Sequence, residues 1–149
     1  MAVGGKYKQG TYTPVDREKY KGVKDPVYRS SWELHVFKYL DRARNVVEWY
    51  AEMPIPYYSS VKGRMARYYV DLYVVYEKNG ERFVEIIEIK PSQELKPPKK
   101  GGGKKAEQTF LQESLTYITN QEKWASAQKY AQERGWKFRI LTENQIFRG

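Results

Sequence analysis

Apolar residues recur along this chain at two periods, one helical and one of two residues, and each change of period marks a new element. A first helical stripe follows Ser30, where Ser30 and Glu33 have the spacing of a capping box. The residues of this stripe are Trp32, Val36, Tyr39 and Leu40. We therefore expect a helix that begins near Ser30 and ends between Arg42 and Asn45.

Val46 to Met53, which is rich in apolar and aromatic residues, is predicted to form a first strand. Pro54 and Pro56 should stop this strand, because proline has no N–H to donate to a ladder. Two interpretations are open for residues 57–65, a basic loop that contains serines or a short extension of the sheet.

The two strongest strand patterns cover residues 67–76 and 82–90. Asn79-Gly80 lies between them, and this dipeptide is a strong signal for a two-residue hairpin turn. In such a hairpin Lys78 pairs with Glu81, and every later pair keeps the same sum of residue numbers. The two runs are therefore predicted to form an antiparallel pair with a fixed register.

A long helix and a last strand complete the pattern. The helix should span Ala106 to Arg134 and end at Gly135, with a break at Thr119-Asn120 as one option. Its apolar residues are Phe110, Leu111, Leu115, Ile118, Trp124, Ala127, Tyr130 and Ala131. Trp136 to Leu141 has the pattern of a strand, and residues 142–145 could cap a final helical turn.

The order helix, three strands, long helix, strand (αβββαβ) and the length of 149 residues predict a single domain. We place this domain at residues 28–149. Residues 1–27 are expected to be an irregular basic arm, lying on the domain, on DNA or on nothing. Residues 92–105 are rich in Pro, Gly and Lys, and we expect them to be a mobile basic loop.

Composition narrows the possible functions. The net charge of +9 and the pI near 9.5 favour a polyanionic partner, although such a charge also serves solubility alone. Without cysteine and with one histidine, the chain cannot build a thiolate or His-rich metal site. A bound metal would need oxygen ligands, which favours Mg²⁺ or Mn²⁺ over zinc. No apolar run approaches the roughly 18 residues of a membrane span, so we expect no membrane partner.

The hairpin register brings two acidic residues and a lysine together. Asp71 should face Glu88, with their Cβ atoms roughly 4.5 to 5.5 Å apart, and Lys90 should lie on the same face. Val84 and Ile86 share that face with Glu88, and Tyr69 and Tyr73 share it with Asp71. The face should therefore be partly buried, and an unpaired carboxylate there would be costly. Two carboxylates and an ammonium suit metal-dependent hydrolysis of phosphodiesters. The alternative is the polar, solvent-facing side of an ordinary strand.

The wider pattern resembles the PD-(D/E)XK nuclease superfamily, and within it the head-completion nucleases of T4-like bacteriophages and the TnsA-type endonucleases. The matching stretches span roughly residues 28 to 147 and are YRSSWEL from Tyr28, RYYVDLYV around Asp71, EIKPSQ from Glu88, NQEKW from Asn120 and RGWKFRILTE from Arg134. The resemblance implies a restriction-endonuclease-like core of α/β (α+β) class, with a mixed central sheet flanked by helices.

The resemblance also implies roles for single residues. Asp71 and Glu88 would hold Mg²⁺ or Mn²⁺, the main-chain carbonyl of Ile89 would be a further metal ligand, and Lys90 would be the catalytic lysine. Glu33 matches a helical acid that contacts the metal in such enzymes, but its place in the capping box is an alternative explanation. Val70 occupies the position of the proline in the name PD-(D/E)XK. This departure puts little of the resemblance in doubt.

Further residues are candidates for DNA contacts. Gln93 would orient phosphate or water, or is a loop residue. Asn120 and Lys123 match a family pattern, but a helix break and a solvated lysine explain them as well. The lysines of the basic loop would form a phosphate clamp or remain solvated; they are Lys96, Lys99, Lys100, Lys104 and Lys105. Trp32, Trp124 and Trp136 are expected in the core.

The leading hypothesis is therefore a divalent-metal-dependent DNA endonuclease that processes DNA ends, or branched or flap DNA, during head completion. One alternative is a Holliday-junction-type resolvase, and another is a non-catalytic DNA-binding protein of the virion. A weaker alternative is an RNA-binding module that stacks bases on some of the 14 tyrosines. DNA and phage head proteins are the expected partners, and the protein would be a monomer or homodimer. Its expected location is the host cytoplasm during infection, with the virion as a second location.

Overall fold

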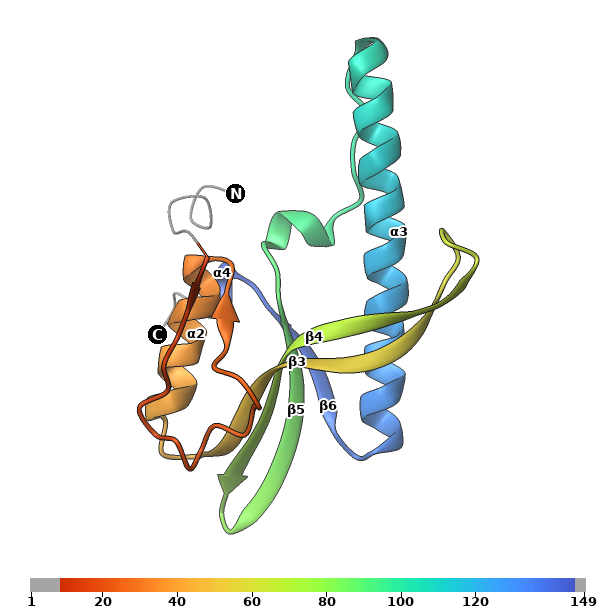
Figure 1. Cartoon of the computed structure of the whole chain (residues 1–149). Coiled ribbons are helices and arrows are strands. Elements are labelled where there is room, and N and C mark those ends of the chain that lie inside the picture. Colours follow the sequence, from red (N-terminus) through yellow and green to blue (C-terminus); the bar gives the residue numbers. More distant parts are fainter. Residues whose placement is uncertain (1–8, 147–149) are drawn as a thin grey trace.

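A four-stranded mixed sheet with strand order β3-β4-β5-β6 forms the centre of the protein (Figure 1). The computed structural model describes residues 9–146, apart from the side chain of Lys105, so residues 1–8 of the expected arm and 147–149 of the expected domain lie outside the described residues. The first three strands are antiparallel neighbours, and the last is parallel to β5. The strands are β3 (Val46–Ser59), β4 (Arg64–Lys78), β5 (Glu81–Ile89) and β6 (Lys137–Leu141).

Helices α2 (Ser31–Arg42) and α3 (Gly103–Glu133) lie on opposite sides of this sheet (Figure 1). Neighbouring residues of β5 separate the two cores, because Ile87 packs in the α2 cluster and Ile86 in the α3 cluster. Two short elements, η1 (Ser92–Leu95) and α4 (Glu143–Ile146), follow β5 and β6. The predicted fold class and the order αβββαβ are confirmed.

One expected boundary is wrong, because β3 does not stop at its prolines. Pro54 pairs with Tyr69 and Pro56 with Arg67 in the ladder between β3 and β4. β3 is an edge strand of the four-stranded sheet, and these prolines are two residues apart. Both can therefore face the side of β3 that has no neighbouring strand, where no N–H is needed for a ladder hydrogen bond. Residues 57–59 and 64–65 therefore extend the sheet as a long hairpin, the second of the two interpretations.

Helix α3 runs without a break through Asn120, and it begins three residues earlier than predicted. Gly135 ends it with a positive φ of 74°, while the Trp136 N–H donates to the Ala131 carbonyl, as expected for a glycine C-cap. Only the second half of the helix packs on the sheet, whereas Leu111 remains 57% exposed. Within the described residues, no helix has the length and apolar character needed to cross a membrane.

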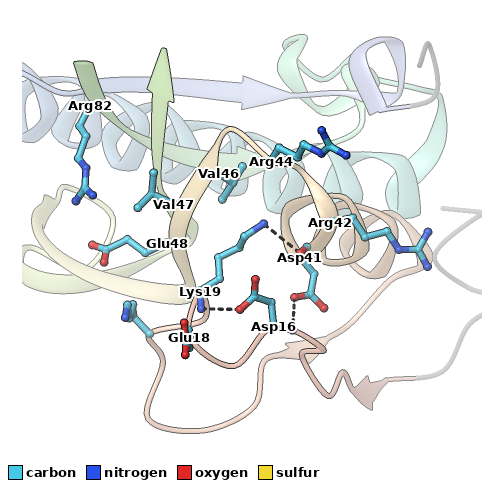
Figure 2. A pocket seen from close by; sticks show the side chains of 11 residues that line it. Asp16, Glu18, Lys19, Asp41, Arg42, Arg44, Val46, Val47, Glu48 and Arg82 are labelled. Atoms are coloured by element: carbon cyan, nitrogen blue, oxygen red, sulfur yellow. Dashed lines mark hydrogen bonds between the residues drawn. The ribbon is translucent and has the colours of Figure 1, made fainter. Parts of the chain in front are cut away.

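The segment before α2 is held against the C-terminal end of that helix (Figure 2). Lys19 Nζ donates to the carbonyls of Leu40, Asp41 and Ala43 at 3.1, 3.1 and 2.7 Å. The buried Asp41 carboxylate accepts hydrogen bonds from the Tyr12 hydroxyl at 2.6 Å and from the main-chain N–H groups of Val15 and Asp16. Two short strands, β1 (Gly10–Thr11) and β2 (Val27–Tyr28), pair within the same segment.

Replacing Asp41 with asparagine is expected to lower the free energy of unfolding by about 2–3 kcal/mol, because one of its charged acceptor oxygens becomes a donor. Burial alone would raise the pKa of Asp41, but its hydrogen bonds hold that pKa below the ordinary 3.8. The contribution of the ionised group is therefore present above that ordinary value, and it is lost as the pH falls through the lowered pKa of the folded state.

Urea denaturation at neutral pH measures this effect. Asp25→Asn is the matched control, because Asp25 makes a more exposed ion pair with Arg17 and should cost less than about 1 kcal/mol. Equal losses for the two variants would contradict this account of how the N-terminal segment is held.

Candidate active site

The pairing of β4 with β5 ends just before Asp71. The ladder follows the predicted register from Lys78 and Glu81 as far as Leu72 and Ile87. Asp71 and Glu88 are next in that register, but β4 separates from β5 there, and the Asp71 carboxylate accepts a hydrogen bond of 2.7 Å from the Ile89 main-chain N–H. The side chain of Asp71 therefore takes the place of a ladder partner, and the opening between the strands forms the site.

Glu88 is buried, with 7% of its surface exposed. Its Oε1 accepts a hydrogen bond of 2.7 Å from the hydroxyl of Tyr68, which is also buried. The buried face expected from the sequence is present at Glu88, whereas Tyr69 beside Asp71 is 50% exposed. Sequence reasoning missed Tyr68, because strict alternation places it on the other face of β4 from Asp71.

Burial acts on both carboxylates, and the charge of Glu88 acts on Asp71 as well. Burial, followed by the charge of Glu88, raises the pKa of Asp71 well above its usual value. Burial also raises the pKa of Glu88, although the Tyr68 hydrogen bond and the charges of Lys90 and Lys123 oppose this rise. Both carboxylates are therefore destabilised as anions, so a cation between them would be favoured.

Lys90 follows at the end of β5 and lies within electrostatic range of both acids. Its side chain is 27% exposed, and its Nζ is 3.8 Å from Glu94 Oε1. Its main-chain N–H donates to the Leu141 carbonyl, which continues the pairing of β5 with β6 by one residue. The ammonium is thus held beside the carboxylates while it remains in contact with solvent.

Glu143 fixes the chain immediately after Lys90. Its two carboxylate oxygens accept hydrogen bonds from the Ser92 N–H at 2.8 Å and the Ser92 hydroxyl at 2.7 Å. Both hydrogen bonds lower the pKa of Glu143. Sequence reasoning did not assign a role to this pair, although EIKPSQ and RGWKFRILTE, the stretches that carried the resemblance, contain Ser92 and Glu143 respectively.

Glu33 lies at the start of α2, as predicted. Its N–H donates to the hydroxyl of the N-cap residue Ser30, and its Oε1 accepts from the Arg29 N–H at 2.9 Å. Burial raises the pKa of Glu33, and the charges of Glu52 and Lys90 act on it as well. Ser30 therefore caps the helix as predicted, whereas the Glu33 carboxylate accepts from Arg29 in place of Ser30. Asp71 is also within electrostatic range of Glu33.

These features can be compared with known proteins. The family model described as the TnsA-like endonuclease N-terminal domain matches residues 43–143. A curated relative, the head completion nuclease of Enterobacteria phage T4, is 38% identical over 143 residues, covering 92% of each chain. This chain belongs to the TnsA-like endonuclease family. The resemblance inferred from the motifs is confirmed, and the matched range includes Asp71, Glu88 and Lys90 but not Glu33.

In this member of the TnsA-like family, Lys123 of α3 lies near the candidate site, on the side of the sheet that α3 covers. Its Nζ lies 5.5 Å from the centre of the Tyr68 ring and 5.9 Å from that of Tyr57. Burial lowers the pKa of Lys123, while the charge of Glu88 opposes this change. Asn120, one turn earlier in α3, is buried, with 8% of its surface exposed.

The other residues predicted to bind DNA lie along the connection from β5 to α3. Gln93 is exposed in η1. Lys100 pairs with Glu107 at 3.4 Å. Lys105 lies in the first turn of α3, but its side chain is outside the described part. The remaining lysines of this group are all exposed, and they are Lys96, Lys99 and Lys104.

The donor chemistry suits a divalent cation, because carboxylate and carbonyl oxygens are the ligands that such ions prefer. Among residues 9–146, no group of three or more acidic, histidine or cysteine side chains is arranged to hold a metal ion. Asp71 and Glu88 instead point to protein donors, the Ile89 N–H and the Tyr68 hydroxyl. The residues therefore fit a metal by charge and chemistry, without indicating which ion.

A separate cavity of about 800 Å³ lies near the C-terminal end of α2 and contains none of the predicted catalytic residues (Figure 2). Its lining includes Lys19, Asp16 and Asp41, which make the hydrogen bonds that hold the N-terminal segment. These groups explain the position of that segment, and we assign no catalytic role to the cavity.

Proposed function

We propose that this protein is a divalent-metal-dependent DNA endonuclease whose site is formed by Asp71, Glu88 and Lys90, with Glu33 as a fourth member. The observation that carries the proposal is the pair of carboxylates, Asp71 and Glu88, at the opening between β4 and β5, with the ammonium of Lys90 within electrostatic range of both. Membership of the TnsA-like endonuclease family supports phosphodiester hydrolysis as the reaction.

The metal would be held by the carboxylates of Asp71 and Glu88, by the Ile89 carbonyl and, directly or through water, by Glu33. When bound, Mg²⁺ or Mn²⁺ supplies a water of lowered pKa and stabilises charge on the phosphate. As an ammonium, Lys90 would position the attacking water or screen the scissile phosphate, whereas as a neutral amine it would accept the proton of that water. Attack with inversion at phosphorus would form a P–O bond to the water oxygen and break the P–O bond to the leaving oxygen, which takes a proton from solvent.

Residues around the site hold these groups in place. Tyr68 fixes the orientation of Glu88 by its hydrogen bond. The bonds from Ser92 to Glu143 fix the chain that leaves Lys90. Lys123 adds positive charge on the α3 side, where it attracts phosphate. The exposed lysines between β5 and α3 supply a more distant clamp for the DNA backbone.

The biological setting follows from the relative in phage T4, which is a head completion nuclease. We infer that this chain acts on DNA during completion of a phage head, in the cytoplasm of the infected host and in contact with head proteins. Single-stranded, duplex and branched DNA are candidate substrates, and the active form is a monomer or a homodimer.

The test is cleavage of single-stranded, duplex, flap and four-way-junction DNA with Mg²⁺, Mn²⁺ or EDTA, using the wild type and Glu88→Gln. We expect metal-dependent cutting by the wild type and at least about a 100-fold slower rate for Glu88→Gln, which keeps the shape but loses the charge. If the protein cut four-way junctions selectively and its mass in solution were that of a dimer, it would be a Holliday-junction-type resolvase. If the protein bound every substrate but cut none, the endonuclease proposal would be wrong, and the alternative of a non-catalytic DNA-binding protein of the virion would remain.

A further inference from the structure

The hairpin formed by β3 and β4 has one face that no other described element covers. Residues of the two strands pair so that their side chains alternate between two faces. We call one of these the outer hairpin face, and its pairs are Pro54 with Tyr69, Pro56 with Arg67 and Tyr58 with Met65. The hairpin projects from the sheet past α3, on the side away from α2 (Figure 1).

The outer hairpin face is both aromatic and basic. Tyr58, Met65 and Tyr69 are exposed over 56%, 58% and 50% of their surfaces. A groove of about 780 Å³ lies along this face, between strand residues 54–56 and 64–69. Residues 54–69 include Lys62, Arg64 and Arg67 but no acidic residue. The face therefore combines flat apolar surfaces with positive charge, which complements a polyanion that carries bases.

The other face of the hairpin is anchored, so the outer face is held in place. Ile55, Tyr57 and Tyr68 are buried in the α3 cluster with Trp124. At the tip, the Ser60 N–H donates to Glu122 of α3 at 3.0 Å. Tyrosines held on such a support lose little conformational entropy when they bind, which favours their use as stacking surfaces.

The outer hairpin face leads to the candidate active site. Met65, Arg67 and Tyr69 alternate along β4, and Asp71 lies two residues further on, where the buried residues of the strand change from the α3 cluster to the α2 cluster. Six strand residues span about 20 Å, which is enough for a few unstacked nucleotides. A strand of DNA lying along this face would therefore reach the site where Asp71 and Glu88 meet.

We propose that the outer hairpin face binds the unpaired bases of single-stranded DNA, with Tyr58 and Tyr69 stacking on bases and Arg67 contacting phosphates. This inference rests on the proposed function and deepens it, because it names single-stranded DNA, or the single-stranded part of a flap, as the preferred substrate. A duplex keeps its bases stacked on each other, and it would contact this face through phosphates alone.

The test is binding, measured in EDTA by fluorescence anisotropy so that cleavage plays no part. The probes are a labelled oligothymidylate of about 12 nucleotides, the same length of backbone without bases, and a duplex. Tyr58→Ala and Tyr69→Ala are each expected to weaken binding to oligothymidylate by about tenfold, but to change binding to the baseless strand by less than about twofold. Tyr39→Ala is the matched control, because Tyr39 is 60% exposed on α2.

Thermal unfolding of each variant shows whether the fold is retained, and Tyr58→Phe, which keeps the ring, should bind as the wild type does. The inference is overturned if Tyr58→Ala and Tyr69→Ala bind oligothymidylate as tightly as Tyr39→Ala does. It is also overturned if they lose affinity for the baseless strand or the duplex to the same extent. Failure of the proposed function is distinguishable, because an inactive protein can still show this base-dependent binding.

Discussion

Lys90→Ala is expected to lower the rate of metal-dependent DNA cleavage by about 10²–10³-fold, with little change in stability or DNA affinity. Lys90 is the ammonium that lies within electrostatic range of Asp71 and Glu88 at the end of β5. Without it, neither the attacking water nor the scissile phosphate has its positively charged partner. Single-turnover cleavage with saturating protein measures the chemical step apart from binding.

A second lysine of the same hairpin provides the control for this prediction. Lys78 is exposed at the other end of the β4–β5 hairpin, next to the Asn79-Gly80 turn. Lys78→Ala removes the same charge and should cut DNA at the wild-type rate. If both variants lost activity to the same extent, the effect would be one of net charge, and the catalytic role of Lys90 would be wrong.

Asp71→Asn is expected to abolish cleavage and, in metal-free buffer, to raise the free energy of unfolding by about 1–2 kcal/mol. The pKa of Asp71 is raised by burial and by the charge of Glu88, so its ionised form is disfavoured in the folded protein. Asparagine removes that charge, and its carbonyl can still accept the hydrogen bond from the Ile89 N–H. The variant therefore recovers the stability that burial and the charge of Glu88 cost the ionised Asp71, but it loses a proposed metal ligand.

Urea denaturation in EDTA, with and without added Mn²⁺, measures this second effect. Mn²⁺ should stabilise the wild type and leave Asp71→Asn unchanged, because the ion binds the folded site alone. Asp16→Asn, an exposed change outside the site, serves as the control and should show the wild-type response to Mn²⁺. If Asp71→Asn were less stable than the wild type in EDTA, the claim that the charge of Asp71 destabilises the metal-free protein would be wrong.

The sequence predicts the elements whose signals are local. The Ser30 N-cap, the Asn79-Gly80 hairpin register and the Gly135 C-cap are all present, because each depends on the chemistry of a few neighbouring residues. The strand end predicted at Pro54 and Pro56 is wrong, since the effect of proline depends on whether a strand lies at the edge of the sheet. That position is a property of the whole sheet and is not visible in a short window.

The candidate site likewise contains residues that local signals predict and residues that only the tertiary structure brings together. The hairpin register brought Asp71 and Glu88 together, because it depends on one turn. Tyr68 was missed, because the buried residues of β4 change from the α3 cluster to the α2 cluster at Asp71, which simple alternation does not predict. Glu143 was missed because it lies 51 residues from Ser92 in the chain. The residues that support the candidate site from distant elements need the tertiary structure, whereas the facing carboxylates of a hairpin can be found from its turn.

The most direct test of the central claim is the return of metal to protein that has been treated with a chelator. End-labelled DNA is incubated with the wild type or Asp71→Asn while Mg²⁺ or Mn²⁺ is added in steps. The account predicts no cutting without metal, cutting by the wild type as metal is restored, and binding without cutting by Asp71→Asn. Cutting in the presence of EDTA, or cutting by Asp71→Asn at the wild-type rate, would contradict it.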